Sequence, residues 1–136
     1  MHWLYPANLK FYDVVGAFAE PATYWPVSSS VEPDDVVYIY LAAPHKQIAF
    51  VCDVLKTGLD ENAAIEHVRP FFKGDPSSGR KKQFMKLHKS ADVALTDASP
   101  LSYARLKENG LTGMLMGPRK LENNPALLTY IEGNAP

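Results

Sequence analysis

The stretch ATYWPVSSS, residues 22–30, places two large aromatic side chains, Tyr24 and Trp25, against a proline and follows them with serines. Its hydrophobicity shows neither the alternation of a strand nor the period of a helix, and the prolines at 21 and 26 favour an irregular loop. An aromatic ring in a loop can fill one end of a hydrophobic core, or it can offer its face to a planar ligand. The residues alone leave both roles open for Trp25.

Half of the basic side chains lie in one short segment. Residues 69–89 carry seven Lys or Arg against one acidic residue, Asp75, although the net charge of the whole chain is −1. Its centre, KGDPSSGRKK, joins turn-forming residues to four cations and predicts an exposed loop. Such asymmetry indicates an anionic partner, while a solvated basic loop is the simpler interpretation. The four cations are Lys73, Arg80, Lys81 and Lys82.

One arrangement could support catalysis. The segment LKTGLDE brings Lys56, Thr57 and Glu61 close together at the end of a predicted strand. A threonine activated by a lysine is a known type of nucleophile, although turn formation explains the same residues. The four histidines and the single cysteine show no metal-ligand spacing, and the sequence has no glycine-rich phosphate loop. We therefore expect no metal and no cofactor.

Length and composition indicate one soluble globular domain over residues 1–136, with 46% hydrophobic residues. No apolar run approaches the length of a membrane span, and the first residues lack a basic start followed by an apolar stretch. These features predict a cytoplasmic location and no membrane partner. Cys52, within the apolar run IAFVCDVL, is expected to be a buried structural thiol.

The hydrophobic pattern predicts a sheet built around a central hairpin. A strand over residues 2–5 is followed by a helix over 8–18 with Asn8 as its N-cap. Apolar runs over 36–44 and 47–57 predict two buried antiparallel strands, and alternation resumes over 83–89. In that last strand, Met85 and Leu87 share one face, and Lys86 and His88 share the other.

Two helices are expected near the end of the chain. The first begins with Ser99 as its cap and Pro100 in its first position, and Gly110 ends it. The second runs from Asn124 to Gly133 and has the same signals, a capping residue followed by a proline at the start and a glycine at the end. Strands that follow each other closely pair antiparallel most simply. The pattern as a whole predicts an α+β domain around a curved sheet or small barrel.

The sequence resembles the EVE domain family of the PUA-like fold. The shared features are a Trp-x-x-Pro-x-Asn start, YDVVGAF, a linker with Trp and Ser, a turn ending in Asp, VYIY and IAFVCDV. FMKL, LKENGLTG, GPRKL and LLTYI are similar to the closing half of EVE domains that stand alone or are fused to restriction nucleases. The similarity covers Trp3 to Ile131. One departure is Asp34, where the family usually has glycine.

The resemblance implies a PUA-like fold, with a five- to six-stranded curved sheet or barrel flanked by short helices and a pocket for one nucleobase. EVE domains are related to ASCH domains and similar to YTH domains, which hold a methylated base between aromatic walls. By this resemblance Trp25 is a wall of the pocket, Asn8 hydrogen-bonds the base edge, and Ser28 and Ser29 supply a hydroxyl. Tyr5 and Tyr40 are candidates either for pocket walls or for core positions, and Trp3 is expected in the core.

Together these features predict a non-enzymatic reader that flips a modified base, 5-methyl- or 5-hydroxymethylcytosine in DNA, into an aromatic pocket. The basic loop would bind phosphates, and DNA is favoured over RNA as the partner. A separate nuclease or other effector protein could act with the domain. The alternative is a small amidohydrolase that acts on a modified nucleoside through Lys56, Thr57 and Glu61. A third interpretation is a protein-interaction domain whose loop aromatics contact another chain.

Overall fold

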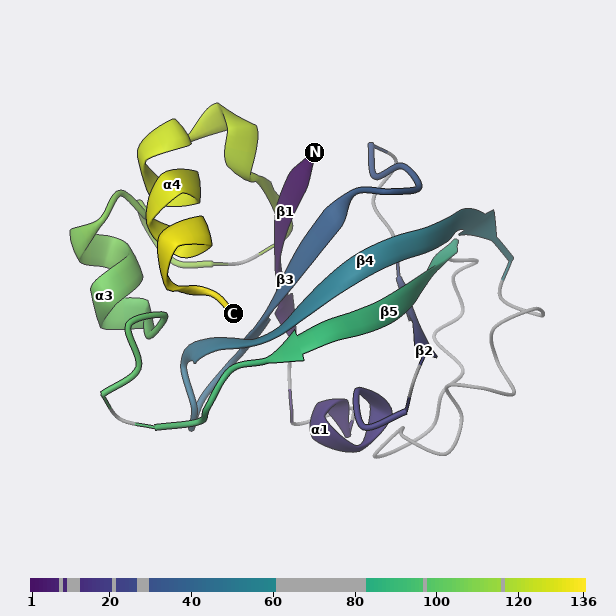
Figure 1. Ribbon diagram of the computed structural model, residues 1–136, viewed down its shortest axis with the longest axis horizontal. Helices are drawn as coiled ribbons and strands as arrows, with labels where there is room; N and C mark the ends of the chain where they lie inside the picture. Colours follow the sequence, from purple (N-terminus) through teal and green to yellow (C-terminus); the bar gives the residue numbers. More distant parts are fainter. Residues whose placement is uncertain are drawn as a thin grey trace.

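A computed structural model describes residues 1–7, 9, 13–20, 22–26, 30–60, 83–96, 98–115 and 117–136. Within these residues, one curved mixed sheet has the strand order β2-β5-β4-β3-β1-β6, with short helices at its sides (Figure 1). The predicted fold class, a curved α+β sheet flanked by short helices, is confirmed. The strands are β1 His2–Ala7, β2 Ala22–Pro26, β3 Val36–Leu41, β4 Gln47–Leu59, β5 Phe84–Asp92 and β6 Arg119–Lys120. The helical segments are α1 Val14–Ala17, α3 Tyr103–Glu108, the 3-10 turn η2 Leu121–Asn123 and α4 Pro125–Asn134.

The predicted hairpin forms the centre of the sheet, because β3 and β4 pair antiparallel and lie between β5 and β1. Strand β1 departs from the antiparallel expectation and runs parallel to β3, with Trp3 opposite Val37. The chain between these two strands contains α1 and β2, and a crossover of this length is what a parallel pair requires.

Each face of the sheet packs against its own hydrophobic cluster. On the inner face, Val37 and Ile39 of β3 join residues of α1, β2 and β5. On the outer face, Tyr38 and Tyr40 pack with residues of α3, η2 and α4. We call these groups the inner cluster and the outer cluster. The expected core positions of Trp3 and Cys52 are confirmed, since both are buried in the inner cluster.

The predicted loop over residues 22–26 is wrong. This stretch is the edge strand β2, antiparallel to β5, with Thr23 opposite Leu87 and Trp25 opposite Met85. Thr23 and Trp25 are both buried, so the strand does alternate, but a polar residue occupies one inward position and Tyr24 an outward one. Pro26 is accommodated because it ends an edge strand, where a missing N–H donor is tolerated.

Helices α1 and α3 begin later than the sequence pattern predicts. Asp13, not Asn8, caps α1, since its Oδ1 accepts from the N–H of Gly16 at 3.1 Å. Ser102, not Ser99, caps α3 by accepting from the N–H of Arg105 at 3.3 Å. The end of α3 is as expected, because Gly110 follows in a left-handed conformation with φ +121.

Helix α4 matches its prediction at the start and extends further at the end. Asn124 accepts from the N–H of Leu127 at 3.3 Å, and Pro125 occupies the first turn. Gly133 lies inside this helix, which ends at Asn134. None of the helices in the described part of the chain is long and apolar enough to cross a membrane.

Candidate nucleic-acid interface

Trp25 lies one residue before the end of β2, with its side chain on the inner face of the sheet. Its ring is 5.6 Å from that of Phe18 between centroids, at an angle of 45°. Phe18 in turn stacks on Phe50 at 5.0 Å with the rings inclined by 20°. A continuous row of three aromatic rings therefore lies on this face. It consists of Phe18, which directly follows α1, Trp25 of β2 and Phe50 of β4.

Trp25 differs from the other aromatic residues of the inner cluster in its exposure. It is 9% exposed, the most of any member, whereas Phe18 is 0% exposed and Phe50 6%. Its position in an edge strand explains this difference, because β5 borders β2 on one side only. The ring is thus part of the core and at the same time its most accessible aromatic member.

The two candidate tyrosines lie on opposite faces. Tyr5 of β1 is buried in the inner cluster together with Trp25. Tyr40 belongs to the outer cluster and packs edge-on against Tyr103, with centroids 6.4 Å apart. Burial, with a smaller contribution from Tyr103, raises the pKa of Tyr40 to about 12. The structure therefore brings Tyr5 to the same side as Trp25 and does not bring Tyr40 there.

The remaining predicted pocket residues, Asn8, Ser28 and Ser29, lie outside the described residues. Their described neighbours are far apart along the sheet. Ala7, which precedes Asn8, is opposite Leu41 of β3. This pair lies at the end of the sheet where β4 begins. Pro26, which precedes the serines, is opposite Phe84 at the end where β4 finishes.

The predicted phosphate-binding residues Lys73, Arg80, Lys81 and Lys82 also lie outside the described residues. The segment that contains them joins two described strand ends, because β4 finishes at Leu59 and β5 starts at Phe84. These two residues are directly opposite each other in the sheet. The basic segment is therefore attached at the same end of the sheet as Pro26 and the end of β2.

The residues of the amidohydrolase alternative are only partly described. Lys56 is exposed and Thr57 half-buried, both in β4, and Glu61 lies outside the described residues. Consecutive side chains of a strand point to opposite faces, which does not favour a contact between Lys56 and Thr57. Over the described ranges, His, Cys, Asp and Glu side chains form no group of three that could hold a metal ion.

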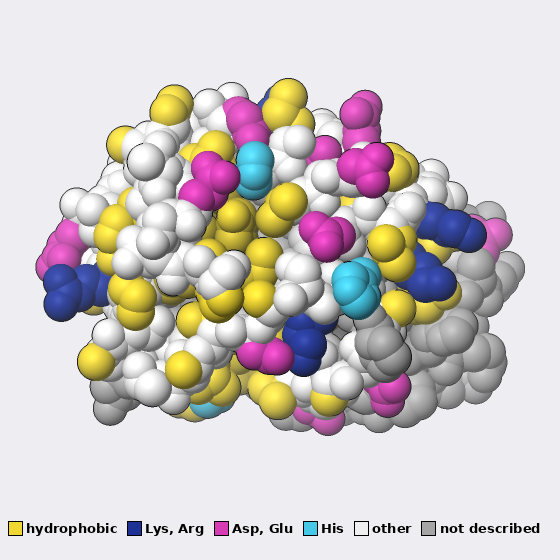
Figure 2. Space-filling model, viewed as in Figure 1, with side chains coloured by type: hydrophobic (Ala, Val, Ile, Leu, Met, Phe, Trp, Pro, Cys, Tyr) yellow, Lys and Arg dark blue, Asp and Glu magenta, His cyan; other side chains and the backbone are white. Residues whose placement is uncertain are grey.

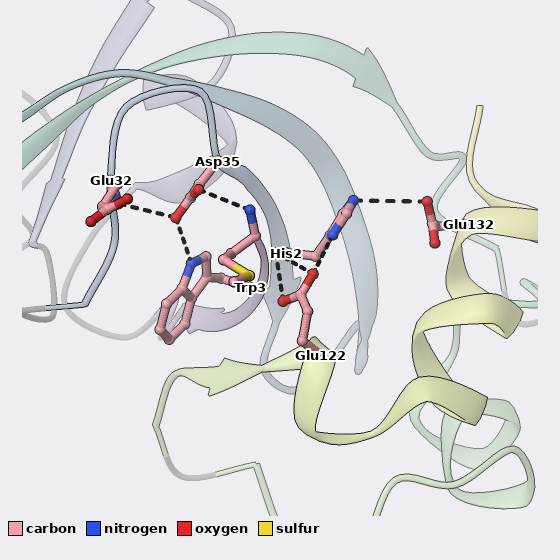
Figure 3. A network of polar contacts seen from close by, with 7 residues as sticks. His2, Trp3, Glu32, Asp35, Glu122 and Glu132 are labelled. Atoms are coloured by element: carbon pink, nitrogen blue, oxygen red, sulfur yellow. Dashed lines mark hydrogen bonds and ion pairs between the residues drawn. The ribbon is translucent and has the colours of Figure 1, made fainter.

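The clearest polar network of the described residues surrounds β1 (Figure 3). Asp35 Oδ2 accepts from the indole Nε1–H of Trp3 at 2.9 Å and from the N–H of Glu32 at 3.0 Å, and its Oδ1 accepts from the Met1 amino group at 2.9 Å. Burial alone would raise the pKa of Asp35, but these three donors outweigh it and hold the pKa below its ordinary value. The network fixes the turn before β3 to β1.

A second set of contacts in Figure 3 ties β1 to the helices. Glu122 accepts from the backbone N–H of His2 at 2.9 Å and lies 2.6 Å from its Nδ1, while Glu132 lies 3.7 Å from Nε2. Burial would raise the pKa of Glu122, yet the contacts with His2 hold it below its ordinary value. Burial raises the pKa of nearby Tyr38, and the charges of Glu132 and Glu122 add to that shift. We interpret both networks as structural.

The sequence pattern pointed to Trp25 but missed its aromatic neighbours. The sequence pattern places Phe18 in the predicted helix over 8–18 and Phe50 in the predicted buried strand over 47–57, and nothing in their spacing predicts a shared row with Trp25. Their contact depends on how α1 and β2 fold back over β4. The feature that they share in the sequence is that all three are large aromatic residues within the region that resembles EVE domains.

No protein-family model matches this chain, and no curated protein matches it by sequence. Solved structures do match it. The ASCH protein of Zymomonas mobilis has a TM-score of 0.60 at 12% identity, with 94% of each chain covered. A point mutant of that protein reaches a TM-score of 0.70 at 8% identity, with 99% of each chain covered.

The protein Atu2648 from Agrobacterium tumefaciens is also similar, with a TM-score of 0.56 at 14% identity over 95% of this chain and 92% of that one. At such low identities, the likeness concerns the fold. It spans nearly the whole chain and includes the curved sheet and its flanking helices. The described residues therefore share the fold of the ASCH structures, whereas the finer EVE assignment stays a prediction.

Proposed function

We propose that this domain binds nucleic acid and reads a modified base, 5-methyl- or 5-hydroxymethylcytosine in DNA, in a pocket beside Trp25. The ASCH-like fold supports the general part of the proposal, because the PUA-like superfamily is one of RNA- and nucleic-acid-binding domains. The observation that carries the specific part is the position of Trp25. It is the most exposed member of a buried aromatic row, at the end of an edge strand.

A ring in this position suits base stacking. Stacking a base on an aromatic side chain contributes about 1–3 kcal/mol and does not depend on base identity. A platform mounted on a strand and backed by Phe18 is held more rigidly than one on a loop, so less conformational entropy is lost on binding. Discrimination would come from polar groups at the base edge, and Asn8, Ser28 and Ser29 are the proposed donors and acceptors.

Flipping a base out of a duplex costs a few kcal/mol, so other contacts must offset it. Lys73, Arg80, Lys81 and Lys82 are proposed to provide them by binding backbone phosphates without regard to sequence. Their segment attaches to the sheet at Leu59 and Phe84, the end at which β2 also finishes. A bound strand could thus contact the basic segment and Trp25 together. A separate effector, such as a nuclease, would then act on the marked site.

The proposal predicts different effects for the two parts of this interface. Replacing Trp25 with Ala would remove a buried aromatic side chain at a cost of about 3–5 kcal/mol, so Trp25→Leu is the better test because it keeps apolar volume. It should abolish the preference for a modified duplex and leave weak general binding. Phe50→Leu, a similar change in the same row, is the control and should keep the preference.

Neutralising Arg80, Lys81 and Lys82 together should instead weaken binding to modified and unmodified duplexes alike and flatten the salt dependence. Affinities are measured by fluorescence anisotropy with labelled duplexes at several salt concentrations. Identical behaviour of the Trp25→Leu protein and the charge-neutralised protein would contradict the proposed division of roles.

A further inference from the structure

The outer face of the sheet is covered by helices over only part of its area. Described helices α3 and α4 pack over the outer cluster, which includes Leu4, Tyr38 and Val51. Beyond it, β4 and β5 extend together away from these helices, as the right half of Figure 1 shows. No described helix covers this extension on the side that faces the viewer.

The strand register arranges the outward residues of this extension in three rows across β4, β5 and β2. The first row is Asp53, His88 and Ala22, and the last is Leu59, Phe84 and Pro26. The middle row is Lys56, Lys86 and Tyr24. Figure 2 shows dark-blue Lys and Arg side chains together over this end of β4 and β5.

The middle row places two lysines directly opposite each other. Like charges in such cross-strand positions destabilise a sheet. Neither Lys56 nor Lys86 forms an ion pair with a described residue, whereas Lys89, farther along β5, lies 3.0 Å from Asp92. Lys56 is exposed and Lys86 half-buried. The pair therefore concentrates positive charge that the described part of the chain leaves without an acidic partner, and an external anion would neutralise it.

We propose that Lys56 and Lys86 bind backbone phosphates of the nucleic-acid strand whose base is read at Trp25, an inference that rests on the proposed function. Tyr24 and Trp25 are consecutive residues of an edge strand, so their side chains point to opposite faces. Tyr24 is opposite Lys86 on the outer face, while Trp25 is opposite Met85 on the inner face. A strand that passes around the β2 edge can therefore insert a base on one face and place its neighbouring phosphates on the other.

The test measures how salt weakens binding to a short labelled DNA duplex with one central 5-methylcytosine. Removing one phosphate-binding cation reduces the slope of log affinity against log salt by about 0.9. The variant Lys56→Gln/Lys86→Gln should therefore show a slope shallower by about 1.8. Between about 50 and 200 mM salt, the affinity of the wild type should then fall by a factor about twelve times larger than that of the variant.

The control variant Lys46→Gln/Lys107→Gln removes the same charge from two exposed lysines at the opposite end of the sheet, where the N–H of Tyr103 donates to the carbonyl of Lys46. It should keep the wild-type slope. A third variant, Lys56→Glu, puts opposite charges in the middle row. Its thermal unfolding midpoint should rise while its duplex affinity falls, a combination that loss of folding cannot produce.

A slope in Lys56→Gln/Lys86→Gln equal to that of the control would overturn the assignment of these lysines and leave the proposed reading of a base at Trp25 standing. A wild type that binds no duplex would overturn both proposals. Vesicles of phosphatidylserine and phosphatidylcholine provide a further comparison. If these lysines are required for vesicle binding but not for duplex binding, the surface serves a membrane and the proposal is wrong.

Discussion

The indole nitrogen of Trp3 lies 2.9 Å from Oδ2 of Asp35, a hydrogen bond that links β1 to the turn before β3 inside the protein. Asp35 is 5% exposed and accepts from two further donors, the Met1 amino group and the N–H of Glu32. The carboxylate needs both of its oxygens as acceptors, because donors approach each of them. An amide at this position would turn an NH2 group toward at least one donor.

We therefore expect Asp35→Asn to lower the free energy of unfolding by about 2 kcal/mol, within the range for hydrogen bonds to charged groups. Urea denaturation at neutral pH measures this change. Asp34→Asn is the matched control, because it alters the same turn at an exposed residue and should have little effect. Equal stability of the two variants would show that the Trp3–Asp35 bond contributes little.

Asp34 itself adopts a left-handed backbone conformation with φ +72. Glycine enters this region freely, Asp and Asn enter it at modest cost, and a β-branched residue is strongly disfavoured. Asp34→Gly should therefore be neutral or slightly stabilising, and Asp34→Val should destabilise by about 1–2 kcal/mol. Thermal unfolding of both variants provides the test, and a Val variant as stable as the Gly variant would contradict it.

Glu122 should stabilise the packing of η2 and α4 against β1 through its contacts with His2. Glu122→Gln is expected to lower the free energy of unfolding by about 1–3 kcal/mol at neutral pH. Glu132→Gln is the control, since Glu132 is half-exposed and 3.7 Å from His2, and it should cost less than about 0.5 kcal/mol.

The effect of Glu122→Gln should depend on pH with a definite sign. The pKa of Glu122 is lower in the folded protein than its ordinary value of 4.5. A carboxyl group of this kind contributes its stabilisation above the unfolded-state pKa and loses it as the pH falls through the folded pKa. The difference between wild type and Glu122→Gln should therefore shrink as the pH is lowered below 4.5. A difference that grows in acid would refute this.

Cys52 should be inert in the folded protein. Its side chain is fully buried in the inner cluster, and burial, with Asp53 and Asp92 nearby, raises the pKa of the thiol well above its ordinary value. The thiolate is the reactive form, so a disulfide reagent should label Cys52 only as fast as the protein unfolds. Rapid labelling under native conditions, without loss of circular dichroism, would show that β4 opens locally.

The apolar runs predicted the central hairpin because β3 and the first half of β4, residues 47–52, are buried on both faces and contain few polar residues. Strand β2 was missed for the opposite reason. Thr23 points inward and Tyr24 outward, so the residue types conceal the alternation that the backbone follows. Only the pairing with β5 reveals that this stretch is a strand.

The start of α3 was misplaced because a tertiary contact decides it. The N–H of Ile48 donates to the carbonyl of Leu101, and the N–H of Tyr103 donates to that of Lys46. These bonds hold residues 101–103 against the start of β4, so the helix begins only at Tyr103, and the nearby Ser102 becomes its cap. Ser99 and Pro100 are residue types that suit a helix start, but the chain at that point forms other contacts.

The sequence identified Trp25 as unusual but could not predict the lysine pair. The ladder between β4 and β5 shifts register between Val54 and Lys56. Without that bulge, Leu55 would lie opposite Lys86, and no two lysines would meet. A bulge depends on the packing of both strands, and no residue type in this segment predicts it.

The most direct test of base reading is tryptophan fluorescence during titration with duplexes that differ only at one central cytosine, which is plain, 5-methylated or 5-hydroxymethylated. If Trp25 stacks on an extruded modified base, a modified duplex will quench the fluorescence saturably, and the plain duplex will do so weakly. The quenching will disappear in Trp25→Phe, in which Trp3 is the remaining tryptophan. Equal, purely salt-dependent responses to all three duplexes would contradict the reading of modified cytosine at Trp25.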